Sequence, residues 1–107
     1  SDIEVSTEQL TDIGKMSNLV TLYLDKCNVS DDDLASFSSL EHLNYLNLSG
    51  NEISDGGLES LSKLPLLSDI YVFGSKVSLD TLANGANIIK GGFTLESLET
   101  DTLRFSL

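Results

Sequence analysis

The sequence is poor in the residues that build disulfides, metal centres and nucleic-acid interfaces. Its 107 residues include one Cys, one His and no Trp, so we expect neither an internal disulfide nor a cysteine-based metal site, and we predict no cofactor. Lys and Arg number 6 against 17 Asp and Glu, which gives a formal net charge of −11. Because nucleic acids and anionic membranes attract basic patches, this balance argues against both as partners. No apolar run approaches the roughly 20 residues needed to cross a bilayer.

What the sequence does contain is apolar residues at a fixed interval. They make up 40% of the chain, which suits one compact domain rather than a disordered acidic tail. Three columns repeat every 24 residues: Leu19, Leu43 and Leu67; Leu22, Leu46 and Ile70; Leu24, Leu48 and Val72. The residues between these positions give the alternation typical of strands. A unit this small cannot bury its own apolar face, so we expect the units to stack on one another.

A second apolar pattern predicts short helices between these strands. Its columns are Leu10, Leu34, Leu58 and Leu82; Ile13, Phe37 and Leu61; and Met16, Leu40, Leu64 and Ile88. The same interval separates four serines placed where helix N-caps belong: Ser6, Ser30, Ser54 and Ser78. Asp31, Asp32, Asp33 and Asp55 would then lie in first helical turns, where the helix dipole favours negative charge. Calcium binding is the alternative for the Asp run, but the alternating ligands and the distal Glu of a calcium loop are missing.

The segments LVTLYLDKCNV, LNYLNLSGNEI and LLSDIYVFGSKV resemble the leucine-rich repeat pattern L-x-x-L-x-L-x-x-N/C-x-L. The continuation NEISDGGLESLSKL resembles the 24-residue variety of that family, and the resemblance covers about residues 3–90. It implies an α/β fold, a right-handed solenoid of about 3.5 repeats with parallel strands on the concave face and short helices on the convex face.

The expected organisation is a single domain over residues 1–107. We predict a partial repeat at about 1–18, repeats at 19–42, 43–66 and 67–90, and an irregular C-terminal cap at 91–107. The cap is predicted because Gly91 and Gly92 fall where the next strand should open. At the other end Ile3 and Val5 form only half a repeat, which favours a segment of a longer chain because an unguarded sheet edge is a liability.

In the family, a position in the turn after each strand favours Asn, whose side chain bonds the backbone of the neighbouring turn. Here this column reads Ile3, Cys27, Asn51 and Ser75. We expect Cys27 to be a buried thiol, because no second Cys and no nearby His would support a redox or catalytic role.

The strand residues between the core positions are expected on the concave face. The candidate binding residues there are Thr21, Tyr23, Tyr45, Asn47, Asp69, Tyr71 and Phe73. Tyr45 should lie beside Tyr23 and Tyr71, with Phe73 near them. Tyr combines rigid apolar area with one polar group, which suits recognition. The alternative is that neighbouring aromatic residues stabilise the sheet and bind nothing.

An enzyme is not expected. Asp25 and Asp69 are the only acids in the concave-face columns. Two repeats of about 4.8 Å each would place them about 10 Å apart, whereas a glycosidase pair needs roughly 5–9 Å. The sequence also contains no G-x-S-x-G motif and no P-loop.

The resemblance implies a non-enzymatic module that binds a protein or peptide through its concave face. The acidic composition predicts a basic patch on that partner. A weaker resemblance, carried by ISDGGLESLSKL, IYVFGSKV and NIIKGGFTL, is to the terminal repeat region of bacterial surface proteins that carry a cytochrome c-type module. The alternative function is therefore a passive docking domain of a larger surface-anchored protein, with an extracytoplasmic location favoured over a cytoplasmic one. This segment has no C-x-x-C-H motif and so cannot attach haem covalently.

Overall fold

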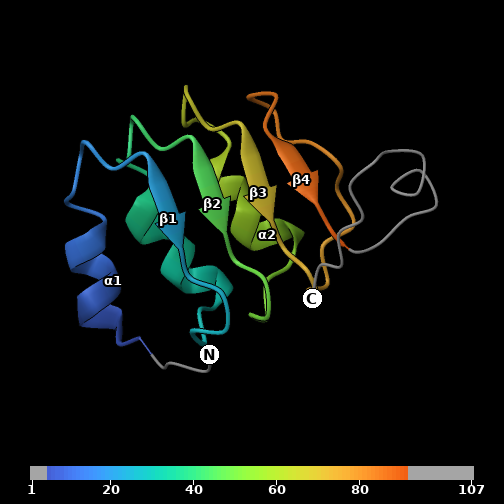
Figure 1. Ribbon diagram of the computed structural model, residues 1–107, viewed down its shortest axis with the longest axis horizontal. Coiled ribbons are helices and arrows are strands. Elements are labelled where there is room, and N and C mark those ends of the chain that lie inside the picture. The colour runs from blue at the N-terminus through green and yellow to red at the C-terminus, as the bar shows by residue number, and fades with distance from the viewer. Residues whose placement is uncertain (1–4, 92–107) are drawn as a thin grey trace, which may run out of the picture.

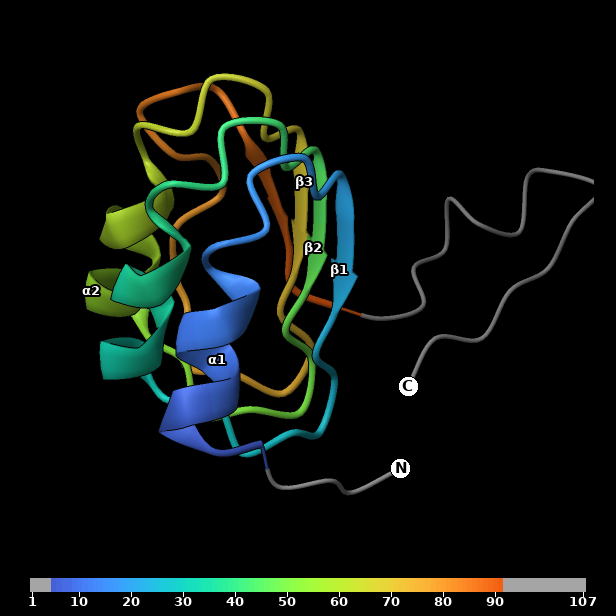
Figure 2. The ribbon, with the colours of Figure 1, turned by 90° about the vertical axis from the view of Figure 1, so that its left-hand side faces the viewer.

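A computed structural model describes residues 5–91 of the chain. The elements follow in the order α1 (Thr7–Ile13), β1 (Thr21–Tyr23), the 3₁₀ helix η1 (Asp31–Phe37), β2 (Tyr45–Asn47), α2 (Asp55–Leu58), the 3₁₀ helix η2 (Glu59–Leu61), β3 (Asp69–Tyr71) and β4 (Asn87–Ile89). The strands form one parallel sheet in the order β1-β2-β3-β4 (Figure 1). The helical segments all lie on one side of this sheet, as Figure 2 shows. The chain thus forms an α/β fold of two layers.

The register of the first three strands confirms the 24-residue interval. Thr21 pairs with Tyr45 and Tyr45 with Asp69, and the same steps join the following residues of each strand. Leu46 and Ile70, which belong to one predicted column, are fully buried on the helix side of the sheet. The residues of one column therefore stack in neighbouring strands.

The core lies between the sheet and the helices. The helical layer contributes buried side chains from the predicted columns, namely Leu10, Leu34, Phe37, Leu40, Leu58, Leu61 and Leu64. Each such side chain stabilises the fold by about 1.5–3 kcal/mol relative to exposure. Met16 is the exception among these columns: the structure places it in the turn after α1, with 53% of its surface exposed, so its prediction as a core residue is wrong.

The helix starts follow the predicted serines in three of four cases. Ser6 caps α1 and forms a capping box with Gln9, while Ser30 and Ser54 precede η1 and α2. Ser78 precedes no helix. Residues 78–86 form turns and irregular segments with a single bridge residue.

The fourth strand comes earlier than the repeat predicts. Asp69 pairs with Asn87, 18 residues on (87 − 69), and Ile88 pairs with Ile70 in the sheet rather than lying in the helical column of Leu64. The cause is a tight turn: Leu82 accepts the Gly85 N–H and donates its own N–H to Ala86, and Gly85 adopts φ +89°. This left-handed conformation suits Gly and ends any helix at that point.

Two sequence predictions concern residues outside the described range. They are the turn position of Ile3 and, apart from Gly91, the cap at 91–107. The cap and the repeat boundaries remain predictions.

Candidate recognition surface

The side of the sheet that faces away from the helices carries all seven predicted binding residues. We call this side the open sheet face. Strand alternation sends Leu46 inward and Tyr45 and Asn47 outward, and the aligned positions of β1 and β3 behave alike. Tyr23 is exposed over 63% of its surface, while Tyr45 and Tyr71 are half-buried.

The three tyrosines and Phe73 form a continuous aromatic row across β1, β2 and β3. Ring centroids lie 5.3 Å apart for Tyr23 and Tyr45, 5.1 Å for Tyr45 and Tyr71, and 6.1 Å for Tyr71 and Phe73. These distances confirm that the four rings are neighbours. Such pairs contribute about 0.5–1.5 kcal/mol each beyond area burial. Burial and the two flanking tyrosines raise the pKa of the Tyr45 hydroxyl above its ordinary value. A protonated Tyr hydroxyl can donate a hydrogen bond.

The three polar members of the set flank this aromatic row. Thr21 and Asp69 lie on either side of Tyr45 in the sheet register, and Asn47 lies between Tyr23 and Tyr71. The Asn47 side chain accepts the Ser49 N–H at 3.0 Å, and Asp69 accepts a long hydrogen bond of 3.4 Å from Asn87 Nδ2. The surface therefore combines rigid apolar area with polar groups held near the backbone.

A hollow of about 230 Å³ opens where the three strands end. Asp25, Lys26, Ser49, Gly50, Phe73 and Gly74 line this strand-end hollow. These residues belong to two adjacent columns of the repeat, one with Asp25, Ser49 and Phe73 and one with Lys26, Gly50 and Gly74. The sequence shows both columns but does not reveal the hollow, because its shape depends on which neighbour is large and which is small.

The two acids considered for hydrolysis do not share a site. Asp25 lines the strand-end hollow, whereas Asp69 is not among its lining residues and instead lies beside Tyr45 in the sheet. Within residues 5–91 no group of three or more His, Cys, Asp or Glu side chains could hold a metal ion. Asp25 and Asp69 therefore do not form the carboxylate pair considered from the sequence.

Asn51 performs the bonding role expected of its turn position. Its Oδ1 accepts the N–H groups of Cys27 (3.1 Å) and Val29 (2.8 Å), and its Nδ2 donates to the carbonyls of Leu24 (2.8 Å) and Leu48 (2.9 Å). Cys27 is buried as predicted, and burial, assisted by Asp25, raises the pKa of its thiol. One side chain thus joins two successive turns.

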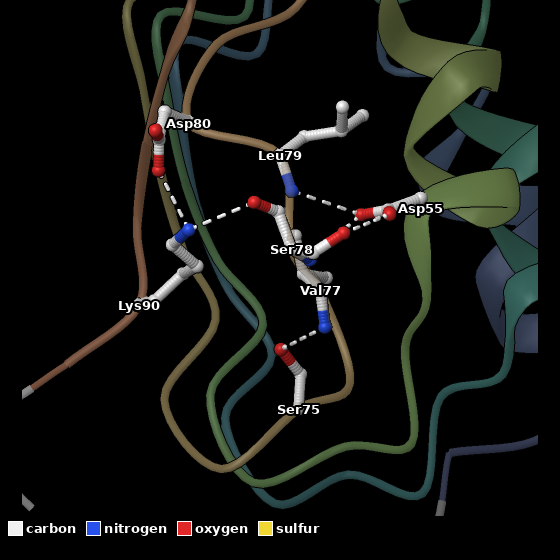
Figure 3. A network of polar contacts seen from close by, with 7 residues as sticks. All are labelled: Asp55, Ser75, Val77, Ser78, Leu79, Asp80 and Lys90. Carbon is white, nitrogen blue, oxygen red and sulfur yellow. Dashed lines mark hydrogen bonds and ion pairs between the residues drawn. The ribbon is translucent and has the colours of Figure 1, made fainter.

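Two aspartates join successive repeats in a way that the sequence pattern does not reveal. The Asp31 carboxylate accepts hydrogen bonds from the backbone N–H (2.9 Å) and the hydroxyl of Ser54, in the following repeat. Asp55 accepts the same pair from Ser78 (2.9 and 2.6 Å) and the Leu79 N–H (3.2 Å), as Figure 3 shows. These bonds lower the pKa of the Asp55 carboxyl group. Both aspartates lie in first helical turns, as predicted. The sequence pattern did not predict that each carboxylate also binds the serine 23 residues later.

Lys90 completes the polar network around Ser78. Its ammonium group donates to the Ser78 carbonyl at 3.0 Å and pairs with the Asp80 carboxylate at 2.6 Å (Figure 3). The segment that replaces the missing helix is thereby bonded on one side to Asp55 and on the other to the residue that follows β4.

Three strands that follow one another at 24-residue steps, their stacked register and an asparagine that bonds successive turns are the features of a repeat protein. The leucine rich repeat family matches residues 17–77, more than half of the chain, so the chain belongs to this family. Domains of this family are generally protein-interaction modules and are typically non-enzymatic. No curated protein matches the chain. The family match does not bear on the weaker resemblance to cytochrome-containing surface proteins. Within residues 5–91 no helix has the length and apolar character to span a bilayer.

Proposed function

We propose that this domain binds a protein or peptide, without catalysing a reaction, through its open sheet face. The proposed contact residues are Thr21, Tyr23, Tyr45, Asn47, Asp69, Tyr71 and Phe73. The aromatic row carries this proposal, because neighbouring ring centroids lie 5.1–6.1 Å apart along the open sheet face. The proposal takes the fold as a right-handed solenoid of about 3.5 repeats, an extension of the register shared by β1, β2 and β3.

Rigid aromatic side chains are well suited to this role. A Tyr orders only two side-chain torsions on binding, so little conformational entropy is lost for a large contact area. Mutual contact already restrains Tyr45 and Tyr71 before any partner arrives. Side chains of this type dominate the binding energy of known interfaces.

The charge of the chain supports a partner with a basic patch. With a formal net charge of −11, the domain attracts cationic surfaces over a Debye length of about 8–10 Å at physiological salt. Such attraction mainly raises the association rate. We expect the association rate constant with the partner to fall as salt is added.

A displayed library of random peptides tests the proposal even while the natural partner is unidentified. Peptides selected on the unmodified domain should lose at least about tenfold in affinity for a variant with Tyr23, Tyr45 and Tyr71 changed to Ser, as expected for hot-spot residues. The control variant carries Met16→Ser and Leu66→Ser, which remove two exposed apolar side chains outside the open sheet face. It should retain binding.

Thermal unfolding of the same variants separates recognition from packing. A large loss of affinity with a small change in melting temperature supports recognition. If the melting temperature collapses while no selected peptide distinguishes the triple variant from the control, the tyrosines only stabilise the sheet and the proposal is wrong.

A further inference from the structure

The strand-end hollow exists because a small residue lies between two larger ones. Ser49, which is buried, follows β2, while Asp25 follows β1 and Phe73 follows β3. Neighbouring strands lie about 4.8 Å apart, so Asp25 and Phe73 face each other across roughly 10 Å. In the adjacent column Gly50 and Gly74 contribute no side chain, and their φ values of +78° and +75° disfavour any other residue. The hollow is therefore built into the turns.

Two of the residues that line the hollow, Asp25 and Lys26, are charged. Neither the Asp25 carboxylate nor the Lys26 ammonium group forms an ion pair within residues 5–91, where Lys90 and Asp80 make the one ion pair present. The Asp25 side chain also makes no hydrogen bond there, since only its backbone carbonyl accepts one, from the Cys27 thiol. A carboxylate at the edge of a hollow is thus available to a ligand.

The wall of the hollow is aromatic and continues the aromatic row. Phe73 lines the hollow and meets Tyr71 edge-on at 6.1 Å. At about 230 Å³ the hollow is smaller than the roughly 300–1,000 Å³ of most small-molecule sites. Its size and its continuity with the aromatic row therefore suit one side chain of a larger partner that also covers the tyrosines.

We propose that the strand-end hollow receives an arginine side chain of the partner, an inference that rests on the proposed function. The guanidinium group would pair with the Asp25 carboxylate and stack on the Phe73 ring. Arg suits this site better than Lys because its planar group is weakly hydrated, binds carboxylates with two donors and stacks on aromatic faces. The formal charge of −11 favours a cation over an anion at the same place.

Lys26 gives the proposal an unusual signature. Lys26 lines the same hollow as Asp25, so its positive charge opposes the approach of a guanidinium group. Asp25→Asn should therefore weaken arginine binding by at least about fivefold, whereas Lys26→Ala should strengthen it by about two- to fivefold, since exposed charge pairs carry small energies. The matched controls are Asp12→Asn and Lys15→Ala, which make the same changes of charge near α1, and both should leave the affinity within about twofold.

The first test uses acetyl-arginine amide as the probe, with acetyl-citrulline amide as its uncharged isostere. In a two-dimensional NMR titration of the unmodified domain, the amides of Gly50 and Gly74 should shift more with arginine than with citrulline. These shifts should shrink in Asp25→Asn and grow in Lys26→Ala. Equal shifts with both probes, no shift at either glycine, or the same response in all four variants would overturn the proposal.

The second test separates this proposal from the proposed function. Library-selected peptides that depend on the tyrosines should contain Arg, and replacing that Arg by citrulline should lower their affinity at least about fivefold. Tyrosine-dependent peptides that lack Arg, or that ignore Asp25→Asn, would overturn the arginine site while leaving the recognition face intact. If no selected peptide depends on the tyrosines, the proposed function itself is wrong.

Discussion

The Asp31 carboxylate of one repeat occupies the space beside the Cα of Gly57 in the next. A Cβ added to Gly57 would overlap Asp31 Oδ1 and Cγ, while a Cβ added to the neighbouring Gly56 would meet nothing within 4 Å. The same carboxylate bonds Ser54. A glycine, an aspartate and a serine therefore act together to hold two repeats at a fixed distance.

This arrangement predicts opposite effects for two adjacent glycines in α2. Gly56→Ala should stabilise the fold by about 0.5–1 kcal/mol, because Ala favours a helix and restricts the unfolded chain. Gly57→Ala should destabilise it by about 1–3 kcal/mol, because the new Cβ displaces Asp31 from Ser54. Urea unfolding measures both free energies.

A double-mutant cycle identifies the cause of the Gly57 effect. In an Asp31→Ala background the carboxylate is gone, so Gly57→Ala should cost much less than in the unmodified chain. An unchanged cost in that background would show that another contact is responsible.

Asn51→Ala should be among the most destabilising single substitutions, at about 3 kcal/mol or more. It leaves the N–H groups of Cys27 and Val29 without their partner in the buried turn. The control is Asn44→Ala, which removes one exposed hydrogen bond to the Leu66 carbonyl and should cost less than about 1 kcal/mol. Similar free energies of unfolding for the two variants would contradict the central role given to Asn51.

Acid unfolding should report the bridge between Asp55 and Ser78. Hydrogen bonds from Ser78 and Leu79 hold the pKa of Asp55 below its ordinary value of 3.8. A depressed pKa stabilises the fold fully above the unfolded-state value, and this stabilisation is lost as the pH falls through the lower folded-state value. Asp55→Asn should therefore make the free energy of unfolding less dependent on pH below about 5.

Asp12→Asn provides the matched control for this measurement, because its exposed side chain makes no hydrogen bond within residues 5–91. Asp12→Asn should leave the pH dependence of the free energy of unfolding below about pH 5 close to that of the unmodified chain. If Asp55→Asn and Asp12→Asn reduce the pH dependence of the free energy of unfolding equally, the bond between Asp55 and Ser78 does not cause this dependence.

The Cys27 thiol should be unreactive in the folded domain. It is buried, and burial raises its pKa, so little nucleophilic thiolate is present at neutral pH. Alkylation by iodoacetamide should be at least about a hundredfold slower in buffer than in denaturant, because it requires local opening of the turn. Rapid labelling of the native protein would contradict this burial.

The sequence predicts the position of a residue where the equivalent residues of successive repeats have the same neighbours. Leu22, Leu46 and Ile70 recur at one interval because each meets the same neighbours, and their register follows. The same logic predicts the contact between Tyr23 and Tyr45, since strand alternation and the register fix both positions.

The repeat misleads where one residue breaks the shared environment. Gly85 replaces the apolar residue of its column and forms a tight turn, so β4 starts six residues early and Ile88 enters the sheet (24 − 18 = 6). The partner of Asp31 was also missed, because a carboxylate near a helix start can serve its own helix or the next repeat, and only the stacking distance decides between them. The strand-end hollow depends in the same way on three side-chain sizes taken together.

Mapping of a bound peptide by NMR tests the recognition face most directly. With a library-selected peptide added to the isotopically labelled domain, the largest shift changes should fall on β1, β2 and β3 at Tyr23, Tyr45 and Tyr71, with smaller changes along η1 and α2. Shift changes concentrated on the helical layer, with the three tyrosines unmoved, would contradict a recognition role for this face of the sheet.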